Sequence, residues 1–152
     1  MTPSPEKAIH DLICRFMQSF DEKDWRLMRE CLDEVIYLDY SSFRNEPPGE
    51  VTADSYVAKR KSALNHLKLQ HNFTNLIITL DGNTATARCN YQILRFHPDF
   101  DKAPALFFHS VGHYQFKFLQ RGTTWKINSI QQILLQNIGN PELHTGVRPA
   151  AP

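Results

Sequence analysis

Hydrophobic residues recur at helical spacing near the start of the chain. Between residues 8 and 20 they follow steps of three and four, which places them on one face of a helix. Ser4 and Pro5 are typical of an N-cap and a first helical position, so the pattern predicts a helix from residue 5 to about residue 20. Shorter helices are expected over residues 25–32 and, after a Thr cap, over residues 52–64.

From residue 67 onward the pattern becomes β-rich. Two glycine-containing turn signals, Asp81-Gly82-Asn83 and Arg121-Gly122-Thr123, predict hairpins, and an earlier strand is expected over residues 35–40. Helices followed by antiparallel strands predict one α+β domain over residues 1–138, with helices on one face of a curved sheet and a hollow between them. The long predicted strands cover residues 67–80, 84–96, 106–119 and 125–136.

The tail over residues 139–152 contains three prolines and little periodicity, so it is interpreted as a flexible end or a flap over a pocket.

The formal net charge of +1 favours neither nucleic acid nor an anionic membrane, and indicates a neutral or weakly polar small-molecule substrate. Three separated cysteines favour free thiols in a reducing compartment. With charges throughout the N-terminal stripe and no membrane-length apolar run, the cytoplasm is the expected location.

Two polar residues stand among positions that otherwise favour burial, namely Asp21 and Tyr40. His71, His97 and His113 are acid–base candidates because imidazole titrates near neutral pH. Each also has a purely structural interpretation. Asp21 could cap a helix, Tyr40 could pack its ring at the sheet edge, and any one histidine is more often a surface or structural residue.

A metal site is not expected. His109 and His113 are four residues apart on a predicted strand, about 13 Å, which is too far for two ligands of one ion. The chain contains no HExxH motif, no close cysteine pair and no GxSxG motif. It also lacks a glycine-rich phosphate loop, so no nucleotide cofactor is indicated.

Several segments together resemble the scytalone dehydratases and, more broadly, the SnoaL-like branch of the nuclear transport factor 2-like superfamily. The similarity covers about residues 9–133. Its more specific parts are the aspartate before KDW, the DYxSF end of the first strand and an isolated QH that opens a later strand. The segments, in order, are SFDEKDWRLMRECL, VIYLDYSSF, LQHNFTN, YQILRFH and TTWKI.

The resemblance implies a cone-shaped α+β barrel, with three N-terminal helices on a strongly curved mixed or antiparallel sheet, and catalysis without a cofactor. It assigns catalytic roles to Asp21, Tyr40, His71 and His97. Asp21 would orient His97 and raise its basicity, His71 would act as base and acid, and Tyr40 would donate to an enolate oxygen. Homo-oligomers, dimers or trimers, are also expected, since other subunits commonly cover sheet faces in this superfamily.

The expected substrate contacts depart from the family. Phe20 stands where the family has a tyrosine, and Val111 and His113 replace a serine and an asparagine. His113 could substitute for the missing phenol. Trp25 and Phe43 complete the expected substrate-binding set.

Three functions remain open on the sequence. The leading one is a cofactor-independent dehydratase acting on an aromatic or polyketide-like hydroxy-ketone in secondary metabolism. The second is a SnoaL-like cyclase or isomerase that uses the same pocket, because one scaffold hosts several reactions. The third is a non-catalytic binding or dimerisation module.

Overall fold

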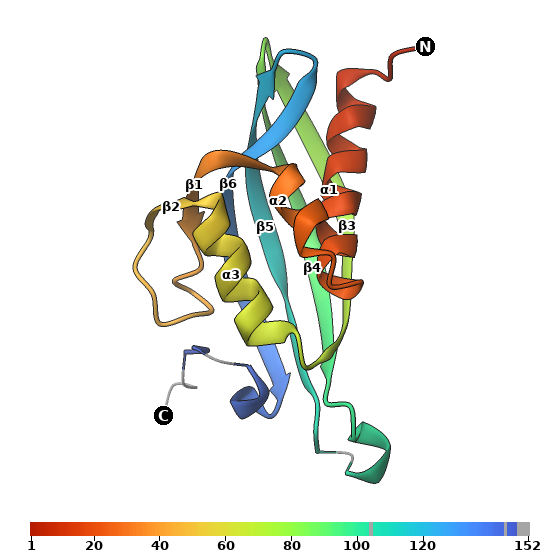
Figure 1. The fold of residues 1–152 in the computed structure, drawn as a ribbon, viewed down its shortest axis with the longest axis vertical. Coiled ribbons are helices and arrows are strands. Elements are labelled where there is room, and N and C mark those ends of the chain that lie inside the picture. Colours follow the sequence, from red (N-terminus) through yellow and green to blue (C-terminus); the bar gives the residue numbers. More distant parts are fainter. Residues whose placement is uncertain (104, 145, 149–152) are drawn as a thin grey trace.

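The computed structural model describes residues 1–103, 105–144 and 146–148. Three α-helices lie on one face of a six-stranded sheet in this part of the chain (Figure 1). The predicted α+β class is therefore confirmed. The elements are α1 (Pro5–Asp21), α2 (Trp25–Cys31), β1 (Leu32–Asp39), β2 (Gly49–Thr52), α3 (Ala53–Leu64), β3 (Lys68–Asp81), β4 (Thr84–Phe96), β5 (Phe108–Arg121) and β6 (Thr124–Gly139).

Helix α1 follows from the apolar stripe at its start. The Ser4 side chain accepts a hydrogen bond from the backbone N–H of Lys7, which satisfies one free donor of the first turn. The stripe includes Ile9, Ile13 and Phe16, none of which is exposed to solvent. Burying this face holds α1 along the sheet, where it contacts β3.

The sheet has the strand order β2-β1-β6-β5-β4-β3. All neighbouring strands are antiparallel except β1 and β6, which are parallel, so the sheet is mixed. Gly82 and Gly122 form the two predicted hairpin turns with φ values of 60° and 62°, a region that glycine adopts without steric cost. The long strands curve around the helices without closing into a full barrel (Figure 1).

Some boundaries differ from the sequence prediction. Strand β1 begins at Leu32 rather than Val35, because Leu32 already pairs with Ile127 of β6. Strand β2 was not predicted; it follows a Pro-Pro-Gly loop and is only four residues long. Strand β6 continues to Gly139, and a short 3-10 turn over Pro141–Leu143 follows. Residues 145 and 149–152 of the predicted tail lie outside the described residues.

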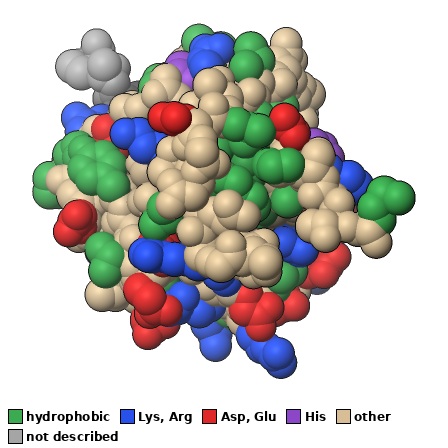
Figure 2. Space-filling model, turned by 90° about the horizontal axis from the view of Figure 1, so that it is seen from above, with side chains coloured by type: hydrophobic (Ala, Val, Ile, Leu, Met, Phe, Trp, Pro, Cys, Tyr) green, Lys and Arg blue, Asp and Glu red, His purple; other side chains and the backbone are tan. Residues whose placement is uncertain are grey.

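Alternation along β4 separates the two faces of the sheet. Ala85, Ala87, Cys89 and Tyr91 are buried toward the helices, whereas the residues between them are exposed on the other face. Positive and negative side chains are interspersed on the molecular surface seen in Figure 2. Of the helices in the described residues, none has the length and apolar character needed to span a bilayer.

Candidate active site

Asp21 and His71 form the most directional polar contact inside the fold. Asp21 is the last residue of α1, and His71 lies on β3, fifty positions later. Nδ1 of His71 lies 2.7 Å from Oδ1 of Asp21, and the backbone N–H of His71 donates to both carboxylate oxygens at 2.9 and 3.0 Å. The carboxylate therefore fixes the position of β3 against the helix and orients the imidazole at the same time.

The environment of His71 favours the neutral imidazole. Its side chain is only 3% exposed, and the Phe20 ring stacks on it with centroids 4.4 Å apart. Burial lowers the pKa of His71, while the hydrogen bond and charge of Asp21 act in the opposite direction and the charge of Arg95 lowers it further. With the hydrogen of Nδ1 directed at Asp21, the lone pair lies on Nε2, as a general base requires.

A pair of buried phenols lies across the same interior. The hydroxyls of Tyr40, which follows β1, and Tyr56, on α3, are 2.7 Å apart. The guanidinium of Arg60 lies over both rings, 5.3 Å from the Tyr40 centroid and 5.2 Å from that of Tyr56. Burial raises the pKa of both phenols, so both remain protonated and one of them can donate beyond the pair.

Side chains from six helices and strands, from the loop after β1 and from the C-terminal segment line one cavity at this point. The free space in it is about 20 Å³, room for about one water molecule. His71 and Tyr40 both contribute to its wall, so a potential base and a potential donor face the same small volume. The lining consists of Phe20, Tyr40, Phe43, Arg60, Leu64, His71, Ile93, Arg95, Tyr114, Gln132 and His144.

The C-terminal segment covers this cavity. His144 is buried in its wall, with its ring 5.4 Å from that of Phe43 and its Nδ1 3.4 Å from the Arg44 guanidinium. Backbone hydrogen bonds attach the segment to the loop after β1: Asn45 N–H donates to the Gly146 carbonyl, and Arg148 N–H donates to the Phe43 carbonyl. The C-terminal segment is therefore held in place as part of the cavity wall.

Four residues expected at the site line the cavity, namely Phe20, Tyr40, Phe43 and His71. Asp21 lies behind His71 and reaches the cavity only through that ring. The expected orientation of His97 by Asp21 is corrected, because the carboxylate binds His71. His97 follows β4, is one-third exposed, and accepts a hydrogen bond from the Asp99 backbone N–H.

Three expected substrate-binding residues lie elsewhere. Val111 and His113 alternate with the inward-facing residues of β5 and so point to the opposite face of the sheet. His113 therefore does not replace the missing phenol; the partner of Tyr40 is Tyr56. Trp25 begins α2 and donates its indole N–H to Asn65 between α2 and α3.

Sequence reasoning did not identify Arg60, Arg95, Tyr114, Gln132 or His144 as cavity residues. A usable signal existed for Arg95: it is two residues after Ile93 on β4, so strict alternation places both on the buried face. A charged residue in the inward register of a strand is itself informative. No comparable local signal marked His144, because its position depends on how the tail folds back.

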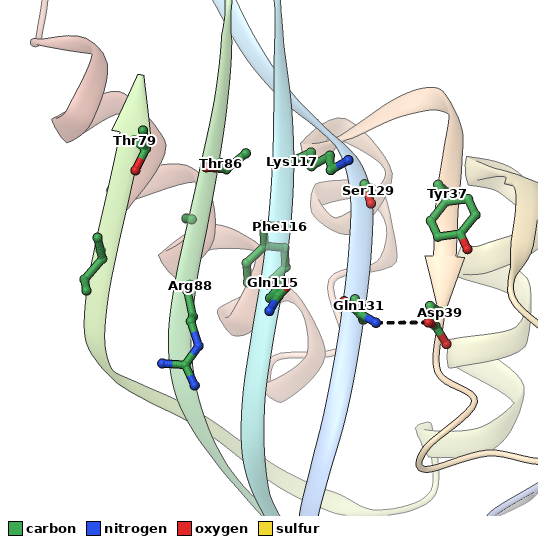
Figure 3. Close-up of a pocket in the computed structure, with 12 residues that line it drawn as sticks. Tyr37, Asp39, Thr79, Thr86, Arg88, Gln115, Phe116, Lys117, Ser129 and Gln131 are labelled. Carbon is green, nitrogen blue, oxygen red and sulfur yellow. Dashed lines mark hydrogen bonds between the residues drawn. The ribbon is translucent and has the colours of Figure 1, made fainter. Parts of the chain in front are cut away.

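A larger hollow lies on the outer face of the sheet, away from the helices (Figure 3). It measures about 620 Å³ and is lined by Arg88, Lys117, Gln115 and other polar residues, and Gln131 donates to Asp39 across its floor at 3.1 Å. The hollow is lined partly by exposed side chains such as Tyr37 and Ile77, and contains no titratable residue expected from the sequence. Every residue that lines the smaller cavity is buried, and we therefore place the candidate active site there.

Metal ligands are not clustered in the part of the chain that the structure describes, where no group of three or more His, Cys, Asp or Glu side chains could hold an ion. The Asp21–His71 pair together with Tyr40 is an arrangement for proton transfer.

Comparison with solved structures shows the same fold at low sequence identity. The Kfla4162 protein from Kribbella flavida superposes with a TM-score of 0.84 at 20% identity, over 91% of this chain and 95% of the other. A protein from Novosphingobium aromaticivorans, provisionally named scytalone dehydratase, gives 0.75 at 12% identity, over 89% and 87%. A hexachlorocyclohexane dehydrochlorinase, LinA type 2, gives 0.72 at 13% identity, over 97% and 93%.

No curated protein sequence matches the chain. The profile of the SnoaL-like domain matches residues 4–131, which span every helix of the described fold and most of the sheet, and the structural neighbours include proteins of the nuclear transport factor 2-like family. The chain belongs to the SnoaL-like domain family.

Proposed function

We propose that this protein is a cofactor-independent lyase that removes water from a small aromatic or polyketide-like hydroxy-ketone. The observation that carries the proposal is the 2.7 Å contact between Asp21 and His71 at the wall of a cavity lined by buried residues, one of which is Tyr40. The names of two structural neighbours, a scytalone dehydratase and a dehydrochlorinase, both describe eliminations and support the same class of reaction.

His71 is the base in this mechanism. Nε2 removes the proton from the carbon next to the substrate carbonyl, and the electron pair of the C–H bond moves onto the carbonyl oxygen to give an enolate. Asp21 accepts from Nδ1 and stabilises the imidazolium that forms. Because burial lowers the pKa of His71, the ring is neutral at pH 7 before the proton arrives.

Tyr40 and His71 complete the elimination. The Tyr40 hydroxyl donates to the enolate oxygen when Tyr56 donates to Tyr40, and a donor in this buried site is worth more than one in water. The enolate re-forms the carbonyl and expels hydroxide from the β-carbon. The imidazolium of His71 protonates that leaving group, so the products are an enone and water, and His71 returns to its neutral form.

The small volume of the cavity has a consequence for access. A hydroxy-ketone is much larger than 20 Å³, so the wall must open to admit it. We assign this movement to the C-terminal segment, because His144 belongs to the wall and the segment is attached to the loop at Phe43 and Asn45 by two backbone hydrogen bonds. The tail then acts as the flap that the sequence suggested.

The direct test is incubation with a panel of hydroxylated tetralone-type ketones, followed by absorbance and mass spectrometry. Formation of a conjugated enone with loss of the mass of one water supports dehydration. The matched control is His71→Ala, which retains the rest of the cavity. Equal turnover by this variant would contradict the assigned base.

One observation favours a second candidate, an isomerase or cyclase. Phe20, which lacks a hydroxyl, stacks on His71 where the resembling family has a tyrosine, so that contact to water or carbonyl is missing. In this reaction the imidazolium returns its proton to carbon, and the product keeps the mass of the substrate. The same assay separates the two, and absence of any turnover would favour a non-catalytic binding module.

A further inference from the structure

Positive charge exceeds negative charge around the cavity. Arg44, Arg60 and Arg95 are 5%, 3% and 2% exposed, and their charges act on one another. Two carboxylates form ion pairs in the described surroundings of the cavity: Glu46, 3.4 Å from Arg44, and Asp21, which is engaged by His71. With His71 neutral, one positive charge is left without a counter-ion in a place where water hardly screens it.

Arg95 is the more deeply held of the two guanidiniums in the cavity wall. Its Nη1 donates to Ser110 Oγ at 2.9 Å and to the Phe108 carbonyl at 3.4 Å, both neutral acceptors. The guanidinium lies 5.2 Å from the ring centroids of both Phe43 and Phe108, two rings that stack on each other. Its Nε is buried and has no hydrogen-bond partner within the described structure.

Arg60 repeats this arrangement from the other side of the cavity. It lies on α3 over the Tyr40 and Tyr56 rings, and its buried Nε likewise lacks a partner among the residues described. Aromatic faces attract a guanidinium, but they do not neutralise it and they do not satisfy an N–H in the ring plane. Two buried guanidiniums, each with an Nε that lacks a partner in the described structure, therefore belong to the wall of one small cavity.

We propose that the substrate carries a carboxylate, which binds to Arg95 and Arg60 in this cavity. A carboxylate has the acceptor geometry that a guanidinium fork recognises, and its single charge balances the excess positive charge. Neutral oxygen acceptors would satisfy the spare N–H groups but would leave that charge unbalanced.

This inference rests on the proposed function and sharpens it, since the substrate class becomes a hydroxy-ketone acid. The carboxylate would hold the molecule in place while His71 and Tyr40 act on its reacting atoms, so binding and chemistry would be carried out by different side chains of one wall. The aromatic side chains of Phe20, Phe43 and Tyr114 in the same wall suit a flat ring.

Calorimetric titration with sodium benzoate and with its neutral analogue benzamide tests the proposal without requiring turnover. Benzoate should bind at least about tenfold more tightly than benzamide at fixed ionic strength, a difference equivalent to about 1.4 kcal/mol. Arg95→Met should remove that preference and leave benzamide binding unchanged. Arg60→Met serves as the second variant if Arg95→Met does not fold, and circular dichroism checks both.

The matched control is Arg88→Met, which removes a guanidinium from the opposite face of the same strand and should leave benzoate binding unaltered. Equal affinity for benzoate and benzamide, absence of benzoate binding, or full benzoate affinity in a folded Arg95→Met or Arg60→Met variant would each overturn the proposal. If benzoate binds as expected but no hydroxy-ketone is turned over, the anion site stands and the proposed lyase activity falls. If neutral ketones are turned over but benzoate binds no more tightly than benzamide, the lyase activity stands and the anion site falls.

Discussion

The two faces of strand β4 carry the same kind of side chain in opposite circumstances. Arg95 points toward the helices, is 2% exposed, and lies against two phenylalanine rings. Arg88 points to the outer hollow of Figure 3, where solvent reaches it. Burial lowers the pKa of Arg95 to about 10, although the guanidinium remains charged at neutral pH.

The comparison teaches that volume does not identify the functional site in this fold. The outer hollow is about 620 Å³ and the inner cavity about 20 Å³. Only the inner cavity combines a desolvated imidazole, a fixed carboxylate and protonated phenols. Electrostatic interactions between such groups are strong because little water competes with them, and chemistry depends on that strength.

Removal of the proposed base, His71, should have the largest effect and should distinguish the inner face of the sheet from the outer face most clearly. His71→Ala should lower kcat/KM by about 10²–10⁴-fold, the usual contribution of a general acid–base, because the variant lacks the imidazole that Asp21 orients. Steady-state kinetics on any ketone that the wild type converts measures this. Comparison of the circular dichroism spectra ensures that the loss is chemical, and wild-type activity in the variant would remove His71 from the mechanism.

Asp21→Asn should have the next largest effect. The amide cannot stabilise an imidazolium as a carboxylate does, so kcat/KM should fall by about 10–10²-fold. The pKa of His71 should also fall further, because the opposing contribution of Asp21 is lost. The acid limb of the pH–rate profile would then move to lower pH, and an unchanged limb would contradict the pairing.

Tyr56→Phe should have a smaller effect. It removes the hydroxyl 2.7 Å from that of Tyr40 but leaves the ring under Arg60, so packing is retained. Losing one neutral hydrogen bond costs about 0.5–1.5 kcal/mol, and we expect a several-fold decrease in kcat with little change in KM. Phe20→Leu, which adds no polar group, is a suitable control for general loosening of the cavity.

The stability of the fold should depend on pH through His71 in a defined direction. Its pKa in the folded state lies below the value of about 6.5 expected in the unfolded chain. The unfolded state therefore binds more protons as pH falls through 6.5, and the free energy of unfolding decreases until the folded-state pKa is passed. Urea unfolding at pH 8 and pH 5 measures this, and His71→Gln should reduce the difference.

Arg88→Met should have the smallest effect and defines the outer face as a control. An exposed substitution of this kind usually changes stability by no more than about 0.5 kcal/mol. Activity should remain within about twofold of wild type. A loss as large as that of His71→Ala would move the functional site to the outer hollow.

How well the sequence predicted each feature depends on how far apart in the chain the residues that determine it lie. The helix over Pro5–Asp21 and the hairpin turns at Gly82 and Gly122 depend on residues close in sequence, and the structure confirms them. The partner of Asp21 depends on which of two histidines lies beside the end of α1, and strand register decides that. His71 pairs with Ile93 inside the sheet, whereas His97 follows the end of β4.

The buried positive charge could not be predicted from the sequence for a related reason. A formal net charge of +1 for the chain indicates a neutral or weakly polar substrate, yet it averages over surface and interior. Arg60 and Arg95 come from a helix and a strand, and Arg44 comes from a loop and contacts the wall residue His144, so only the folded chain brings the three together. The tail residue His144 joins them across one hundred positions from Arg44, a contact that no local pattern encodes.

The ring nitrogens of His71, followed by ¹⁵N NMR across a pH titration of wild type and Asp21→Asn, test the central assignment most directly. We predict a neutral ring with its hydrogen on Nδ1, titrating below 6.5 in the wild type and lower still in the variant. A ring that carries its hydrogen on Nε2, or that titrates at the same pH in both proteins, would contradict the account.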